Sequence, residues 1–183
     1  NTDGQAFAVF DAIGKPELKT DPRFNTVAAR FKNTPEYFSI RAEGLTGRQL
    51  RTARRISHVF LMDVPTYPRL LFITDAAVNV APNLEDKIDI VQNAIDLAHM
   101  LKIADPKVAI LAAVETVNPK MQATLDAAAL CKMADRGQIT GGLLDGPLAL
   151  DNAIDLGAAK IKKITSAVAG QADILVVPDL EAG

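Results

Sequence analysis

The 183-residue sequence has one cysteine, no tryptophan, two tyrosines and two histidines. Because Cys131 stands alone, no disulfide can form within the chain, and we expect a reducing compartment. No apolar run approaches the roughly 20 residues that span a bilayer. The first residues, Asn-Thr-Asp-Gly, lack the basic and apolar regions of a signal peptide. We therefore expect a cytoplasmic protein without a membrane partner.

A strong charge of either sign is also missing, since the formal net charge is −2. This balance gives no reason to expect nucleic acid or an anionic membrane surface as a partner. Two histidines and one cysteine argue against a zinc site. We expect neither a bound metal nor a resident cofactor.

Apolar residues make up 49% of the sequence, and Ala, Leu, Ile and Val dominate, which is typical of strands and helices packed in layers. From residue 54 onward apolar runs alternate with helical patterns. This alternation predicts an α/β domain over 54–183, with a mostly parallel sheet flanked by helices. The first two strands are separated only by a turn at 65–68, so we expect them to be antiparallel. The predicted strands are 56–62, 70–73, 108–113, 139–144 and 174–177. One predicted helix starts at Asn83, and two others cover 119–134 and 149–161.

Residues 1–53 have a different character. Apolar stripes over 5–13, 24–31 and 35–45 predict short helices, and no strand is evident before residue 45. The region has too few apolar residues for a core of its own. We interpret it as a helical N-terminal appendage.

An arginine cluster follows at 47–55. On a helix, Arg48, Arg51 and Arg55 fall on one face. Arg51 and Arg55 are candidates for gripping phosphate groups bidentately. Alternatively, the cluster is a solvated helix face paired with acids elsewhere in the chain.

Acidic residues follow the predicted strands of the sheet. In an open α/β sheet, ligands bind beyond the carboxyl ends of the strands, so these carboxylates could share one ligand edge. Alternatively, each acid caps the helix that follows it. The acids concerned are Asp75, Glu115, Asp145 and Asp179.

The stretch 138–151 is the most informative of these places. It predicts a buried strand that stops at Asp145-Gly146-Pro147 and gives way to a helix. Gly141 and Gly142 then lie inside that strand, where close backbone packing explains them.

The remaining reactive side chains favour structural roles. Ser57 and His58 are neighbours on a predicted strand, so their side chains point to opposite faces and do not form a nucleophile–base pair. We interpret His58 as a structural histidine, His99 as an exposed helix residue and Cys131 as an inert core thiol.

Residues 54–183 resemble the phosphate acetyl/butyryltransferase family. The resemblance is carried, in family order, by the segments Arg54-Arg55-Ile56-Ser57-His58-Val59-Phe60-Leu61-Met62, Leu71-Phe72-Ile73-Thr74-Asp75-Ala76-Ala77-Val78-Asn79, Asp145-Gly146-Pro147-Leu148-Ala149-Leu150-Asp151 and Val177-Pro178-Asp179-Leu180-Glu181-Ala182-Gly183. It implies transfer of an acyl group between coenzyme A and inorganic phosphate. It also implies two α/β domains, related to the isocitrate and isopropylmalate dehydrogenase fold, with the active site in the cleft between them. The matched segment corresponds to the second domain.

The same resemblance indicates which residues line the cleft, although it assigns no catalytic residue, because the family's catalytic serine, arginine and aspartate lie beyond the matched segment. It implies acyl-CoA and phosphate as substrates and a homo-oligomer, commonly a dimer. An incomplete domain would also expose apolar surface that favours association. Two alternatives are a truncated or chimeric chain without activity and a CoA-binding module without turnover. The expected lining residues are Ser57, Asp75, Asn79, Asp145, Pro147, Asp179 and Gly183.

A second resemblance concerns the N-terminal region. Ala12-Ile13-Gly14-Lys15-Pro16-Glu17-Leu18-Lys19-Thr20-Asp21-Pro22-Arg23-Phe24-Asn25-Thr26, followed by Ala29-Arg30, is similar to a segment of the class III CoA transferases, the formyl-CoA transferase type. The family's aspartate nucleophile lies in a part of the fold that nothing here matches. A generic helical surface element is the alternative.

Overall fold

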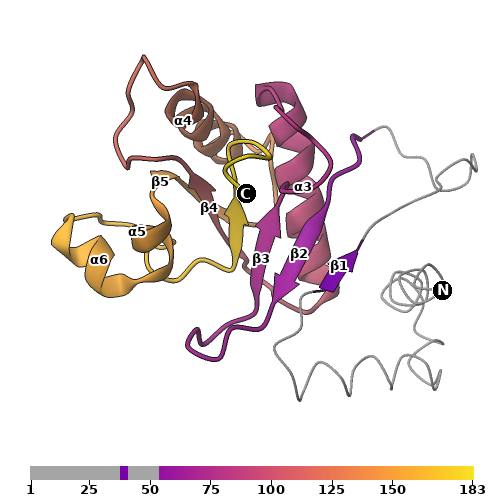
Figure 1. Ribbon diagram of the computed structural model, residues 1–183, viewed down its shortest axis with the longest axis horizontal. Helices are drawn as coiled ribbons and strands as arrows, with labels where there is room; N and C mark the ends of the chain where they lie inside the picture. Colours follow the sequence, from indigo (N-terminus) through magenta and orange to yellow (C-terminus); the bar gives the residue numbers. More distant parts are fainter. Residues whose placement is uncertain (1–37, 41–53) are drawn as a thin grey trace, which may run out of the picture.

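The computed structural model describes residues 38–40 and 54–183 (Figure 1). Six strands form one sheet in the order β1-β2-β3-β6-β4-β5. The strands are β1 (Phe38–Ile40), β2 (Val59–Met62), β3 (Leu71–Thr74), β4 (Lys107–Leu111), β5 (Leu143–Leu148) and β6 (Ile174–Val176). The helices are α3 (Leu84–Met100), α4 (Gln122–Asp135), α5 (Leu150–Ile154) and α6 (Leu156–Ile161).

The strand directions confirm the predicted mixed sheet. β2 and β3 are antiparallel, whereas β3, β6, β4 and β5 run parallel to one another. The carboxyl ends of these parallel strands and the start of β2 therefore lie at one edge of the sheet, at the top of Figure 1. We call this edge the carboxyl rim. It consists of the segment 54–58 and the loops 75–83, 112–121 and 177–183.

Helices pack on both faces of the sheet because strand side chains alternate between the faces. On one face, Phe72 and Ile174 pack with residues of α3 and α4 such as Val91, Ile95 and Leu130. On the other face, the strand neighbours of Phe72 and Ile174, Leu71 and Leu175, pack with Leu148, Ala153 and Ala159. The apolar composition noted above is thus used in a three-layer core. No helix among residues 54–183 is long and apolar enough to cross a membrane.

The first turn of α3 matches the sequence prediction. The Asn83 side chain accepts a hydrogen bond from Asp86 N, and the Asp86 side chain accepts one from Asn83 N, which is a reciprocal capping box. One turn further, Lys87 Nζ lies 2.7 Å from Asp126 Oδ2 of α4, and both side chains are buried. This ion pair ties the two helices together beside the carboxyl rim.

The prediction for the strand around residue 140 was wrong. β5 is Leu143–Leu148, so it starts after the two glycines and runs through Asp145-Gly146-Pro147. Gly141 has φ of +84°, a backbone conformation that ends extended structure. Pro147 is tolerated because β5 is the last strand of the described sheet and has a register irregularity opposite β4.

Two helix predictions also need correction. The expected helix over 149–161 is two short helices, because Asp155 has extended backbone (φ −120°, ψ 118°) and its side chain caps α6 at Ala158 N. α4 begins at Gln122 rather than at Pro119, since the residues before it form a turn closed by Met121 N donating to Asn118 O.

The expectation of no strand before residue 45 was wrong, because β1 pairs antiparallel with β2, with Ser39 opposite Phe60. The helix predicted over 35–45 was wrong at Phe38–Ile40, where β1 lies. The helices predicted over 5–13 and 24–31 fall outside the described residues, as do Arg48 and Arg51.

Three helices end with the same backbone motif. The N–H groups of Lys102, Gly137 and Lys163 donate to carbonyls three residues back, and the next N–H groups donate five residues back, which is the Schellman pattern. These residues have φ of +70°, +72° and +57°. The left-handed position suits glycine, yet lysine fills it at two of the three ends.

We expect Lys102→Gly to raise the free energy of unfolding by about 0.5–1 kcal/mol, because an L side chain in this conformation is strained. Gly137→Ala should lower the free energy of unfolding by about 1 kcal/mol. A Cβ there would meet no other atom within 4 Å, so the loss comes from the positive φ alone. Urea denaturation monitored by circular dichroism measures both. Lys102→Ala is the control and should have little effect. Equal effects of Ala and Gly at position 102 would contradict this explanation.

Candidate functional site

The loop after β3 is organised by Asp75, whose exposed fraction is 1%. Oδ1 accepts hydrogen bonds from Ala77 N and Val78 N, both at 3.0 Å, and Oδ2 accepts from Asn79 N at 3.1 Å and from Asn79 Nδ2. All of these donors belong to the loop itself. The carboxylate predicted to line a ligand site therefore shapes the rim from beneath.

Asn79 connects this loop to the segment before β2. Its Nδ2 donates to Ile56 O at 3.0 Å as well as to Asp75. With both amide hydrogens directed there, Oδ1 faces Arg55 and accepts from Arg55 Nη1 at 3.3 Å. The structure thus brings the predicted residues Arg55, Asn79 and Asp75 into one hydrogen-bonded chain at the rim.

The segment 54–57 is bound along one side of α3. Arg55 Nη2 pairs with Asp86 at 2.6 Å, and Arg54 pairs with Asp96. Asn93 Nδ2 donates to Ser57 Oγ at 3.0 Å. Of the two interpretations of the arginine cluster, pairing with acids elsewhere is the one seen for these arginines. Arg55 does not lie on a helix, and Ser57 is held against α3.

The loop after β6 lies directly against the loop after β3. Leu180 N donates to Val80 O at 3.0 Å, and a Cβ on Gly183 would lie 2.5 Å from Ala76 Cβ. Asp179 Oδ1 accepts from Ala182 N at 2.9 Å, which closes the turn. The predicted residues Asp179 and Gly183 therefore adjoin Asp75 and Asn79, and Gly183 is required for the close approach.

A second polar cluster lies over β4 and β5. Lys162 Nζ is 3.0 Å from Glu115 Oε2 and 3.5 Å from Asp151 Oδ2. The hydrogen bond from Lys162 holds the pKa of Glu115 below its usual value, and Glu115 raises the pKa of Lys162. Both groups are therefore charged at neutral pH, and the lysine links the β4–α4 loop to the end of α6.

Asp145 does not join the rim, contrary to the expectation for the strand-end acids. It lies within β5, opposite Ala109 of β4, and its Oδ1 accepts from Gly146 N at 2.9 Å. Pro147 is buried near the end of the same strand. Gly146 allows close packing, since a Cβ there would lie 2.7 Å from Ile110 O.

The other side chains considered from the sequence have structural roles. His58 is buried and its ring lies edge-on to Phe60 at 4.4 Å. His99 is exposed, as predicted, and its Nε2 lies 2.6 Å from Gly141 O. Burial raises the pKa of the Cys131 thiol to about 12, so this thiol is inert at neutral pH.

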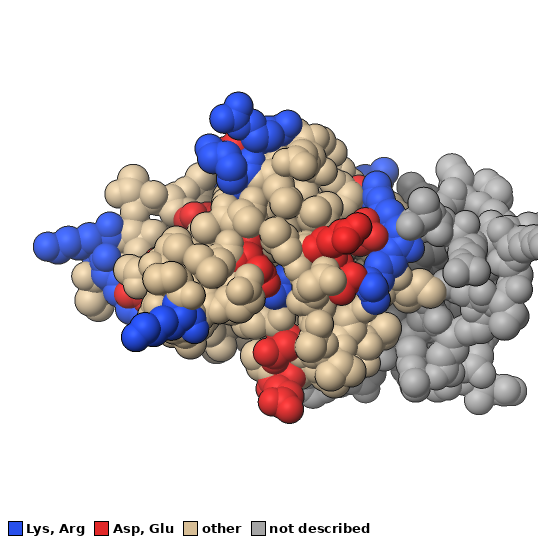
Figure 2. All heavy atoms as spheres, turned by 90° about the horizontal axis from the view of Figure 1, so that it is seen from above, with Lys and Arg blue, Asp and Glu red and all other residues tan. Residues whose placement is uncertain are grey.

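The rim is chemically mixed rather than basic. Figure 2 shows this face from above, with basic side chains at several places along its margin and acidic side chains both between them and at the lower margin. Exposed apolar side chains also project from rim segments, namely Ile56, Val78, Val80 and Val117. Within residues 54–183, no group of three or more His, Cys, Asp or Glu side chains is arranged to hold a metal. Such a surface suits an organic ligand with both apolar and charged parts.

Two contacts at the rim were missed from the sequence. Asn93 lies on α3 and Lys162 directly follows α6, and each binds a residue more than 30 positions away. Nothing local distinguishes Lys162 from the neighbouring Lys160 and Lys163. The role of Asn93 was easier to predict, because with Asp86, Asp89 and Asp96 it forms a polar stripe at helical spacing.

Comparison with known sequences identifies close similarity over most of the chain. The sequence model of the family described as phosphate acetyl/butaryl transferase matches residues 42–183. A phosphate acetyltransferase from Rhizobium meliloti is 64% identical over 151 residues, which cover 82% of this chain and 47% of that protein. A probable phosphate butyryltransferase from Bacillus subtilis is 54% identical over 147 residues, covering 79% and 49%.

Solved structures give the same picture. A branched-chain phosphotransacylase from Enterococcus faecalis superposes with a TM-score of 0.66 and 36% identity, covering 71% of this chain and 46% of that one. A phosphotransacetylase from Streptococcus pyogenes has a TM-score of 0.59 and 31% identity, covering 69% and 38%. The chain spans less than half the length of each of these relatives.

Proposed function

Because this chain belongs to the phosphate acetyl/butaryl transferase family, we propose that it takes part in acyl transfer between coenzyme A and inorganic phosphate. A phosphate oxygen attacks the thioester carbonyl and the carbon–sulfur bond breaks. An acyl phosphate forms, and coenzyme A leaves as a thiol with the proton that the phosphate loses. The observation that carries the proposal is the match over residues 42–183 to this family. The parallel sheet, with its polar loops gathered at one rim, supports it.

We propose further that this sheet is the second domain of a two-domain enzyme of the isocitrate dehydrogenase-like type. The carboxyl rim would then form one wall of the cleft. Exposed apolar side chains at the rim, such as Val78 and Val117, support this orientation, because a cleft wall is covered when the ligand binds.

Among the candidate residues, the contacts separate those at the surface from those beneath it. Asn79, Asp179 and Gly183 shape the loops that a substrate would meet, and Asp75 holds the first of these loops from below. A substrate phosphate at Arg55 would compete with Asp86, so we assign Arg55 a weaker role. Ser57, Asp145 and Pro147 have no contact here that favours a substrate role, and Arg51 lies outside the described residues. Catalytic residues remain unassigned.

The direct test is an assay of acetyl-CoA and butyryl-CoA with phosphate, with free thiol measured over time. We expect phosphate-dependent thiol release. In Gly183→Val, the added side chain would separate the loops after β3 and β6, so kcat/KM should fall at least about tenfold, because small displacements of a substrate-positioning loop strongly affect rate. Lys132→Ala, at the far end of α4, is the matched control.

Calorimetric titration with CoA separates the alternatives. Binding without thiol release favours a CoA-binding module, and a folded chain with neither property favours a truncated or chimeric, non-catalytic domain. Either outcome overturns catalysis by this chain, and equal rates for Gly183→Val and Lys132→Ala overturn the role of the rim.

We also propose a cytoplasmic location and self-association of the chain, the latter supported by the exposed apolar side chains of the described part. The resemblance of residues 12–30 to class III CoA transferases stays a hypothesis, because this segment lies outside both the described residues and the family match.

A further inference from the structure

The β4–α4 loop, residues 112–121 of the carboxyl rim, is attached by its backbone only at its two ends. At its start, Ala112 N donates to Leu148 O at 2.9 Å. At its end, Asn118 N donates to Oγ1 of the fully buried Thr124 at 2.9 Å. Among the backbone hydrogen bonds of residues 54–183, none joins residues 113–117 to another element. The middle of the loop therefore depends on side chains for its position.

Glu115 supplies such a contact from the middle of the loop. Its Oε2 lies 3.0 Å from Lys162 Nζ, which is also 3.5 Å from Asp151 Oδ2 of α5. Lys162 closes α6, since its N–H donates to Ala158 O at 3.1 Å. One ammonium group thus connects the free part of the loop to two helices of the body.

The body side of this connection is fixed. Asp151 Oδ1 accepts from Asn152 N at 2.8 Å. The next residue of α5, Asn152, is fully buried, and its carbonyl accepts from Gly170 N at 2.8 Å. This hydrogen bond joins α5 to the segment before β6. Lys162 therefore has a stationary carboxylate on one side and the loop carboxylate on the other.

Exposed ion pairs contribute little because solvent screens them, but this cluster is better shielded. The side chains of Lys162 and Glu115 are 31% and 29% exposed, against 65% for both members of the surface pair Lys132–Asp135. Three charges are involved rather than two. We therefore expect the cluster to hold the loop more firmly than an isolated surface pair would.

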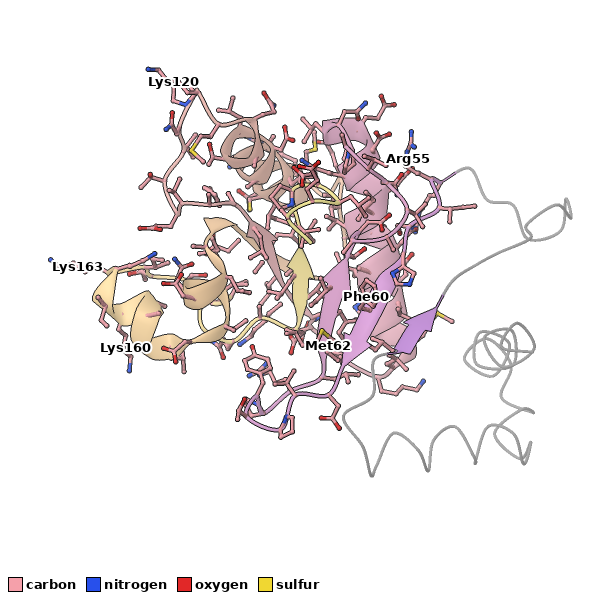
Figure 3. All side chains as sticks on the ribbon, viewed as in Figure 1. Arg55, Phe60, Met62, Lys120, Lys160 and Lys163 are labelled. Atoms are coloured by element: carbon pink, nitrogen blue, oxygen red, sulfur yellow. The ribbon has the colours of Figure 1, made fainter. Side chains whose placement is uncertain are left out.

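The two lysines next to Lys162 do not share its position. Figure 3 shows Lys160 and Lys163 at the outer end of α6, pointing away from the body, and Lys120 at the far end of the β4–α4 loop. Lys162 is the lysine of this end of α6 that meets the loop. The neighbouring Lys160 therefore provides a matched control for charge on the same helix.

We propose that Lys162 is a positioning residue for the acyl transfer, and that it acts through Glu115 to hold the β4–α4 loop in the conformation that receives acyl-CoA at the carboxyl rim. The inference rests on the proposed function and names the residue that arranges one loop of that site. Val117, which is 53% exposed and lies two residues after Glu115, is the apolar side chain whose placement depends on this contact.

The expected kinetic signature follows from the cost of ordering the loop. Without the contact to Lys162, only a fraction of molecules has the loop in the receptive conformation, and apparent affinity falls by that fraction. Once acyl-CoA is bound, the loop is ordered again and the reacting groups are aligned. The variant should therefore change KM much more than kcat.

Steady-state kinetics with acetyl-CoA and butyryl-CoA test this expectation. Lys162→Met should raise KM for acyl-CoA about tenfold and leave kcat within about twofold. Lys162→Arg should stay close to the wild type, because a guanidinium group can also bridge two carboxylates. Glu115→Ala should raise KM as much as Lys162→Met, and the double variant no further, since both changes remove one contact. Lys160→Met should behave as the wild type does.

A fluorescent probe tests the position of the loop without any turnover. The chain has no tryptophan, so Val117→Trp places a single one on the loop. Adding Lys162→Met or Glu115→Ala should lower the fluorescence anisotropy, because the loop then moves on the nanosecond timescale. Adding Lys160→Met should leave the anisotropy unchanged. Circular dichroism should show the same folded spectrum for all of these proteins.

The outcomes separate this inference from the proposed function. A wild-type chain that releases no thiol overturns acyl transfer and the positioning role with it. An active wild type whose KM is unaltered by Lys162→Met overturns the positioning role alone. A raised KM with unchanged anisotropy, or a much larger effect of Lys162→Met than of Glu115→Ala, also overturns it, because Lys162 would then contact the substrate directly.

Discussion

Replacing Asp126 with alanine is expected to lower the free energy of unfolding by about 3–5 kcal/mol. The side chains of Lys87 and Asp126 are 7% and 5% exposed, with Nζ and Oδ2 2.7 Å apart. Without Asp126, the ammonium group of Lys87 stays buried with no carboxylate beside it. Lys87→Met should also lower the free energy of unfolding, by a somewhat smaller amount. The loss is smaller because Gln122 Nε2 still donates to Asp126 Oδ1 at 2.8 Å.

The double variant Lys87→Met/Asp126→Leu should be within about 1 kcal/mol of the wild type, because removing a buried pair together also removes its desolvation penalty. Urea unfolding of the wild type, Lys87→Met, Asp126→Leu and the double variant gives the coupling energy. The exposed pair Lys132–Asp135 is the control, with both side chains 65% exposed, and Lys132→Ala should change stability by less than about 0.5 kcal/mol. Additive effects at 87 and 126 would show that the two charges are not coupled.

This ion pair also shows where the sequence is informative. Apolar residues recur along α3 at helical spacing, which marks the face that packs on the sheet, and Val91, Ile95 and Ala98 of this stripe lie in the core. Lys87 lies on that stripe, three residues after Leu84 and four before Val91. A charge at such a position predicts burial with a partner. The identity of the partner depends on how α3 and α4 pack, which no local pattern contains.

Strand and loop boundaries were less predictable for a related reason. The rule that proline and glycine end strands placed the boundary at Asp145-Gly146-Pro147. β5 continues through these residues because it has a neighbour on one side only in the described sheet. Its edge position is a tertiary property, so a local rule assigned the end of the strand incorrectly.

The strand-end acids were predicted as a group, yet their environments differ. The sequence correctly placed Asp75 and Asp179 after parallel strands, and the structure brings their loops into contact through Leu180 N and Val80 O. Whether a carboxylate faces a ligand or its own backbone depends on the path of the following loop. For Asp75 that path places three backbone N–H groups around the carboxylate.

Asp75→Ala should therefore destabilise the protein by about 3–5 kcal/mol, because it leaves several buried donors without an acceptor. Asp75→Asn keeps one oxygen for Ala77 N and Val78 N but turns an amide group toward the donors of Asn79. We expect roughly half the loss for this variant. Denaturant unfolding monitored by circular dichroism gives both values.

Asp179→Ala is the matched control, because Asp179 also follows a parallel strand but accepts a single backbone hydrogen bond, from Ala182 N. Its loss should be about 1 kcal/mol or less. Should Asp75→Ala and Asp179→Ala prove equally mild, Asp75 would be free to act on a ligand directly, as a strand-end acid in a ligand-binding edge would. The predicted difference instead makes Asp75 the residue that holds the rim in shape, so that substrate contacts fall to the loop it supports.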